Sequence, residues 1–82
     1  MNYAVYGIFD NVAGHFLAPF LMRSEGEALR TFKDLVNEEG TPLNKNPEDY
    51  TLYKLGTWNE ITGEYDGGKI RVTEATAVLK GE

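Results

Sequence analysis

The spacing of hydrophobic residues changes along this chain, and each spacing predicts a different element. Aromatic and β-branched residues fill the segment Tyr3–Phe9, which is typical of a strand. The turn residues DNVAG follow, and Gly14 can take a positive φ, so we expect the segment His15–Met22 to return as an antiparallel strand. Pro19 has no backbone N–H to donate, and its position inside this segment indicates an edge strand.

The middle of the chain has helical spacing. Ser24 and Glu27 fit a capping box, in which the hydroxyl and the carboxylate each satisfy a backbone amide at the start of a helix. The apolar residues that follow recur at i, i+3, i+4 and i+7 and form one stripe: Ala28, Leu29, Phe32, Leu35 and Val36. We expect Gly40 to close this helix as its C-cap. The residues from 41 to 49 are loop formers and predict a loop.

The second half of the chain has the composition of strands. The segment YTLYKLGTW predicts a strand whose alternation puts Tyr53 and Trp58 on opposite faces. NEITGEYDGG predicts a hairpin of about four loop residues, with Gly63 at the position that needs a positive φ. In the final segment KIRVTEATAVL the apolar phase shifts, which predicts a last strand with a bulge near Glu74.

These elements predict an α+β fold in the order ββαββ. We expect a small antiparallel sheet of about four to five strands, with one amphipathic helix packed on one face. A chain of 82 residues makes a single domain, residues 1–82. Because one helix covers only one side of a sheet, at least one ring between Tyr50 and Tyr65 should remain partly exposed.

Composition and charge narrow the functional classes. The chain has no cysteine, which excludes disulfide scaffolds, thiolate zinc sites and thiol catalysis. Polar residues interrupt the apolar stretch at 1–22, so we expect no signal peptide, no membrane-spanning helix and a soluble, cytosolic protein. Thirteen acidic residues against eight basic ones give a net charge of -5, which repels nucleic acid overall. Any DNA-binding site must therefore depend on a local cluster of cations.

Catalytic chemistry has little support in the sequence. His15 is the only histidine, it stands beside a turn, and no nucleophile motif accompanies it. The adjacent acidic pairs Glu38–Glu39 and Glu48–Asp49 have diverging side chains and are typical of solvated charge. Gly67, Gly68 and Lys69 lack the rest of a phosphate loop and are typical of a flexible turn. We therefore expect a protein that is not an enzyme and that uses no cofactor and no metal.

Basic residues interleaved with aromatic ones are the remaining chemical signal. Lys54 adjoins Tyr53 and lies four residues from Trp58, while Lys69 and Arg71 begin a strand that should pair nearby. Proteins that bind single strands stack bases on sheet aromatics and contact the phosphates with cations. The same pattern also fits core aromatics beside solvated lysines, and the sequence pattern leaves both interpretations open.

Two stretches of the chain carry a family resemblance. FLAPFLMRSEGEALRTFKDLVN and TPLNKNPEDYTLYKLGTWNEITGEYD resemble the small nonstructural protein of gokushovirus-type microviruses, which are tailless phages with single-stranded DNA genomes. The similarity runs from about Tyr3 to Asp66, and the C-terminal KIRVTEATAVLKGE carries little of it. Members are commonly described as DNA-binding. The resemblance implies a non-enzymatic phage protein in the infected bacterial cytoplasm, which binds the single-stranded genome or helps to switch replication to single strands before packaging.

The resemblance supplies no individual site residues, so the site hypothesis comes from physical chemistry. We expect Tyr53 and Trp58 to stack bases. The expected phosphate contacts are Lys45, Lys54, Lys69 and Arg71, extended by Arg30 and Lys33 if the helix lies at the same edge. We expect a homo-oligomer, most simply a dimer, because a second copy would double the binding surface. The alternative is an acidic adaptor that contacts a host replication factor or a viral capsid protein through the sheet edge and its rings.

Overall fold

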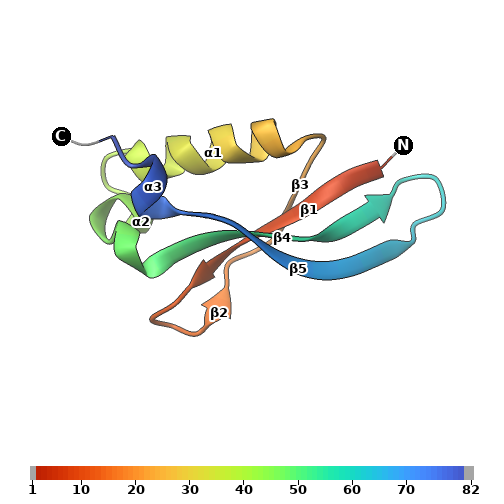
Figure 1. Cartoon of the computed structure of the whole chain (residues 1–82), viewed down its shortest axis with the longest axis horizontal. Helices are drawn as coiled ribbons and strands as arrows, with labels where there is room; N and C mark the ends of the chain where they lie inside the picture. Colours follow the sequence, from red (N-terminus) through yellow and green to blue (C-terminus); the bar gives the residue numbers. More distant parts are fainter. Residues whose placement is uncertain (1, 81–82) are drawn as a thin grey trace.

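The chain forms one antiparallel sheet with its helices on one side (Figure 1). The computed structural model describes residues 2–80. The elements in chain order are β1 (Asn2–Asp10), β2 (His15–Phe16), β3 (Phe20–Met22), α1 (Glu25–Asn37), α2 (Pro42–Lys45), η1 (Pro47–Asp49), β4 (Tyr50–Asn59), β5 (Tyr65–Glu74) and α3 (Ala75–Val78). The strand order is β2-β1-β4-β5, and β3 also pairs with β1. The predicted α+β fold is confirmed.

The predicted second strand is split into two short strands. Gly14 has a φ of 82° and makes the turn after β1, as expected. The Leu17 amide still donates to the Ile8 carbonyl at 2.8 Å, but residues 17–19 form no strand, and the chain pairs with β1 again at β3, through Val5 opposite Leu21. The prediction of one continuous strand over 15–22 was wrong because Pro19 has no backbone N–H for the ladder and interrupts the segment.

Helix α1 begins where the sequence predicts and ends earlier than expected. The Ser24 hydroxyl accepts a hydrogen bond from the Glu27 amide at 3.2 Å, and the Glu27 carboxylate accepts from the Arg23 amide at 3.3 Å. The helix ends at Asn37 and not at Gly40, whose φ of 96° belongs to the turn that follows. The Thr41 hydroxyl donates to the Leu35 carbonyl at 2.7 Å and so satisfies one of the carbonyls of the last turn.

The prediction that residues 41–49 form a loop was wrong. It contains the short helix α2 and the 3-10 turn η1. The Thr41 hydroxyl accepts from the Asn44 amide at 3.0 Å, and Pro42 occupies the first helical turn. Leu43 is buried in the core, so tertiary packing supports a helix of only four residues. Threonine followed by proline is a helix-start signal that the sequence contains.

The last strand is longer at its start and shorter at its end than predicted. Gly63 has a φ of 78° in the hairpin, as expected, but β5 already begins at Tyr65. Gly67 and Gly68 therefore lie inside a strand, and the prediction of a flexible turn there was wrong. The predicted bulge near Glu74 is confirmed: Leu52 opposes Thr73 and Tyr53 opposes Arg71, so Val72 has no partner in β4. The strand then ends at Glu74, where α3 follows.

The hydrophobic core lies between the helices and one face of the sheet, which we call the helix-covered face (Figure 1). Strands β1 and β4 contribute Tyr6, Ile8, Tyr50 and Leu52 to the core, and the helices contribute Ala28, Phe32, Val36, Leu43 and Ala75. The predicted apolar stripe of α1 therefore faces the sheet. Within residues 2–80, no helix has the length and apolar character needed to cross a membrane.

Candidate nucleic-acid interface

The face of the sheet opposite the helices, which we call the open face, carries rings from four strands. In β1 the side chains of Tyr6 and Ile8 enter the core, so those of Tyr3, Val5 and Phe9 point to the other side. Cross-strand partners share a face, and the pairing of β1 with β2, β3 and β4, and of β4 with β5, therefore identifies the rest of the open face. Its residues are Tyr3, Val5, Phe9, Phe16, Leu21, Tyr53, Leu55, Trp58, Tyr65, Lys69 and Arg71.

A bulge in β4 brings Tyr53 and Trp58 to the same face. Tyr53 lies opposite Gly7 and Trp58 lies opposite Tyr3, and both partners are open-face positions of β1. The register changes where Val5 opposes Gly56 and Tyr6 opposes Lys54, so one residue of β4 has no partner in β1. The expectation that the two rings lie on opposite faces was wrong because this extra residue reverses the alternation.

The Tyr65 ring lies across a pair of glycines. Gly56 opposes Gly67 in the β4–β5 ladder, and Gly56 has a φ of 147°. A Cβ on Gly56 would lie 2.9 Å from Tyr65 Cε1, and one on Gly67 would lie 3.0 Å from Tyr65 Cε2. The Tyr65 hydroxyl donates a hydrogen bond to the Leu55 carbonyl. The ring is therefore held against bare backbone on one side, while 55% of the residue remains exposed.

The other rings of the open face form two groups. Phe9, Phe16 and Tyr53 pack edge to face, with centroid separations of 4.8, 5.6 and 6.3 Å. Tyr3 and Trp58 form the second group, with centroids 6.2 Å apart. All five rings are half-buried. They support one another laterally, as aromatic pairs in sheets commonly do.

An apolar groove lies on the open face beside the Tyr3–Trp58 pair. It has a volume of about 440 Å³ and is lined by Val5, Pro19, Leu21, Leu55, Trp58 and Tyr65. None of these side chains is charged. Leu21 is 48% exposed and contributes its apolar surface to the groove.

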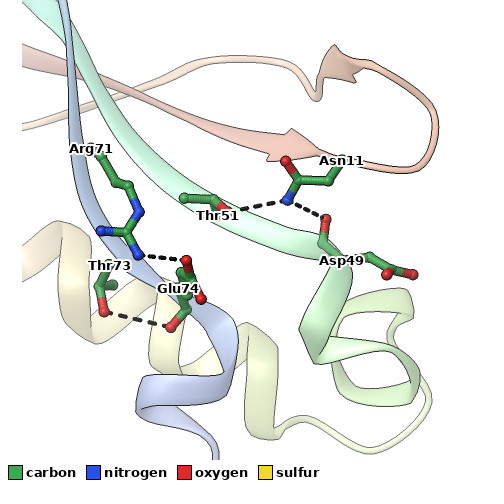
Figure 2. A network of polar contacts seen from close by, with 6 residues as sticks. All are labelled: Asn11, Asp49, Thr51, Arg71, Thr73 and Glu74. Atoms are coloured by element: carbon green, nitrogen blue, oxygen red, sulfur yellow. Dashed lines mark hydrogen bonds and ion pairs between the residues drawn. The ribbon is translucent and has the colours of Figure 1, made fainter.

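Three cations border the rings. Lys69 Nζ lies 5.3 Å from the centroid of the Tyr53 ring. Arg71 opposes Tyr53 in the ladder and forms an ion pair with Glu74 at the end of β5 (Figure 2). On the other side of the open face, the Arg23 guanidinium lies 5.3 Å from the Tyr3 centroid and donates to the Tyr3 hydroxyl at 3.3 Å.

The Arg71–Glu74 ion pair is a weak restraint. The Arg71 and Glu74 side chains are 57% and 49% exposed. Exposed pairs of this kind contribute about 0–1 kcal/mol to stability. Arg71 can therefore exchange its carboxylate partner for a phosphate at low cost.

A polar network holds the end of the open face that lies at the turn between β1 and β2 (Figure 2). The Asn11 side-chain amide donates to the Asp49 carbonyl at 3.0 Å and to the Thr51 hydroxyl at 3.2 Å. The Asn11 backbone amide also donates to the Asp49 carbonyl at 2.8 Å. These bonds attach the turn after β1 to the start of β4, so the strands that carry Phe9 and Tyr53 are fixed relative to each other.

The structure does not bring all of the expected site residues together. Lys54 opposes Tyr6 in the ladder and so lies on the helix-covered face. Lys45 ends α2, while Arg30 and Lys33 are exposed on α1, in the helical layer and not on the open face. Arg30 and Lys33 were expected to extend the phosphate contacts only if α1 lay at the same edge as the site, and it does not.

The predicted site residues did not include Tyr3 and Tyr65 of the open face, or Arg23, which lies beside Tyr3. A glycine inside a strand, such as Gly56, is a sign that another group approaches the backbone closely. That sign does not identify the approaching group, which here comes from nine residues further along the chain. Arg23 precedes the helix cap and has no signal in the local sequence.

A comparison with protein families identifies a family for this chain. The family model described as "Phage ORF5 protein" matches residues 3–78, which include all of β5 and α3. The match thus extends over the segment after Asp66, where the sequence resemblance carried little. No curated protein and no solved structure matched the chain.

Proposed function

This chain belongs to the family of phage ORF5 proteins, and we propose that this phage protein binds single-stranded DNA with little sequence preference and without catalysing a reaction. The observation that carries the proposal is the open face, which carries Tyr53, Trp58 and Tyr65 on the same side of the sheet. Stacking on sheet aromatics tolerates any sequence because every base has a π-face.

Local charge supports the proposal despite the overall charge of -5. Lys69 and Arg71 lie beside Tyr53, and Arg23 lies beside Tyr3, so cations border the open face on two sides. About three phosphate contacts would give a slope of about -2 in a plot of log affinity against log salt. The affinity should then fall roughly 20-fold between 50 and 200 mM salt.

The proposed setting is the infected bacterial cytoplasm. There the protein would act in genome replication, or in the switch to single-strand synthesis and packaging, as the resemblance to microvirus proteins implies. Homo-oligomers would place several open faces along one strand and increase the avidity of binding.

Fluorescence anisotropy with a labelled single-stranded oligonucleotide tests the proposal. We expect Lys69→Ala to weaken binding and to reduce the salt slope by about 0.7, the contribution of one phosphate contact. Lys33→Ala is the matched control, because it removes the same charge from the exposed surface of α1. Binding that is absent at tens of micromolar, or that both variants weaken equally, would contradict the proposal.

A second candidate is an acidic adaptor that binds a host replication factor or a viral capsid protein. The net charge of -5 and the uncharged groove favour it, because apolar grooves also accept peptides. Such binding should depend little on salt. A purified capsid or replication protein that binds the chain, while DNA does not, would support the adaptor.

A further inference from the structure

We propose that the apolar groove holds one nucleobase of the bound strand, with the exposed face of Tyr65 as a stacking surface and Trp58 as a second aromatic wall. This inference rests on the proposed function and assigns a binding subsite within it. The groove of about 440 Å³ lies within the range of about 300–1,000 Å³ that small-molecule sites occupy.

The Tyr65 ring is preorganised for stacking. One face lies on the Gly56–Gly67 backbone, and the hydroxyl is held by the Leu55 carbonyl, so the ring has little freedom left to lose. Immobilising a mobile side chain on binding weakens affinity, and a ring that is already fixed avoids that loss. Gly56 and Gly67 are required here, because a Cβ on either would meet the ring at 3.0 Å or less.

The lining of the groove indicates how a base would be held. Val5, Pro19, Leu21 and Leu55 provide only aliphatic contact. Among the lining side chains, the polar groups are the Tyr65 hydroxyl, which already donates to Leu55, and the Trp58 indole N–H. A base would thus be held by stacking and apolar contact, and its hydrogen-bonding edge would be read weakly. The groove therefore accounts for low sequence preference.

Charge complementarity selects a nucleotide over an apolar peptide or a second copy of the chain. Arg23 lies beside Tyr3, which packs on Trp58 at one end of the groove. Lys69 and Arg71 lie on β5, the strand that also carries Tyr65. A polynucleotide has an apolar base face and anionic phosphates on either side of it, and this is the arrangement that an uncharged groove between cations complements.

Trp58 allows a direct test, because it is the only tryptophan in the chain. The protein is titrated with an oligo-dT strand and with an abasic strand of equal length and phosphate number, and both anisotropy and tryptophan emission are recorded. We expect the dT strand to quench Trp58 and to bind about tenfold more tightly, the effect of one stacked base. The abasic strand should bind weakly through its phosphates and leave the emission unchanged.

Variants of Tyr65 sharpen the test. Tyr65→Leu should lower the affinity for dT about tenfold without changing the affinity for the abasic strand, whereas Tyr65→Phe keeps the ring and should bind dT nearly as the native protein does. Ile70→Ala is the matched control, because Ile70 is 62% exposed on the same strand and opposes Lys54 on the helix-covered face. Circular dichroism of each variant verifies that it is folded.

The possible outcomes separate the two proposals. Equal binding of dT and abasic strands with unchanged Trp58 emission would overturn the nucleobase site and leave DNA binding intact. Trp58 emission that changes with protein concentration alone would also overturn it, since a second copy would then cover the groove. Failure of both strands to bind would overturn the proposed function and the subsite together.

Discussion

Replacing Gly56 with alanine perturbs the feature that organises the open face. Gly56 has a φ of 147°, which side-chain-bearing residues rarely adopt. An added Cβ would also lie 2.4 Å from the Asp66 carbonyl oxygen and 2.9 Å from Gly67 Cα. Both of these atoms belong to the backbone of β5, so the clash cannot be relieved by rotating a side chain. The substitution must therefore separate β4 from β5 locally.

The expected loss of stability combines two effects. Backbone strain of this kind amounts to about 1–3 kcal/mol. Separation of the strands at Gly56 and Gly67 removes one or two ladder hydrogen bonds, each contributing about 1 kcal/mol. We expect a total of about 2–5 kcal/mol, with a central value of about 3 kcal/mol. A domain of this length has a free energy of unfolding of about 4–12 kcal/mol, so the variant should be severely weakened.

Urea unfolding followed by Trp58 fluorescence measures this loss. For a domain of this size the m-value is about 1 kcal/mol/M, so the urea midpoint should fall by about 3 M.

Two glycine variants serve as controls that separate backbone strain from steric clash. Gly63→Ala has a φ of 78° but no atom within 4 Å of the new Cβ, so it should lose only about 1–2 kcal/mol. Gly68→Ala meets open space and should change stability by less than about 0.5 kcal/mol. Gly56→Ala as stable as Gly68→Ala would refute the reasoning.

Three further predictions concern the core, the C-terminal segment and pH. Phe32→Ala leaves a cavity at a fully buried position and should lower the free energy of unfolding by about 3–5 kcal/mol; a loss below about 1 kcal/mol in the urea assay would contradict the core assignment. Asn37→Ala removes the side-chain acceptor of the Lys80 amide, which lies at 2.7 Å, and should speed hydrogen exchange at that amide. Burial raises the pKa of Tyr6 and Tyr50 above the ordinary value of 10.0, and nearby carboxylates add to the effect. As the pH rises, the unfolded chain therefore loses the two tyrosine protons before the folded chain does. The contribution of the two hydroxyls to stability is complete below pH 10 and is lost as the pH rises through the folded pKa values. The alkaline fall in Tm should be shallower in Tyr50→Phe, and an unchanged slope would contradict this.

The elements of this fold were largely predictable because their signals are local. Ser24 caps α1 through a contact only three residues away, and the stripe that includes Phe32 needs only helical periodicity to show its buried side. Gly14 and Gly63 were located by the same short-range logic, since a tight turn imposes its own φ. The helix in the predicted loop has a local start signal in Thr41 and Pro42, but a helix of only four residues depends on the burial of Leu43, which is a tertiary contact.

The candidate site was only partly predictable. The sequence indicates Tyr53, Trp58, Lys69 and Arg71 by type, but their grouping depends on strand register. Alternation predicts faces correctly only while a strand stays regular, and an extra residue in β4 reverses it between Tyr53 and Trp58.

By itself, then, the sequence determined the α+β class, the amphipathic helix and the presence of rings that one helix cannot cover. The tertiary structure alone decided which rings share the open face, that Tyr65 lies on Gly56, and that Lys54 points away from them. The physical reason is the distance along the chain over which each signal acts. Caps, turns and periodicity act over a few residues. The bulge arises between β1 and β4 and the close backbone approach between β4 and β5, and the register of these strands is set only when they pair.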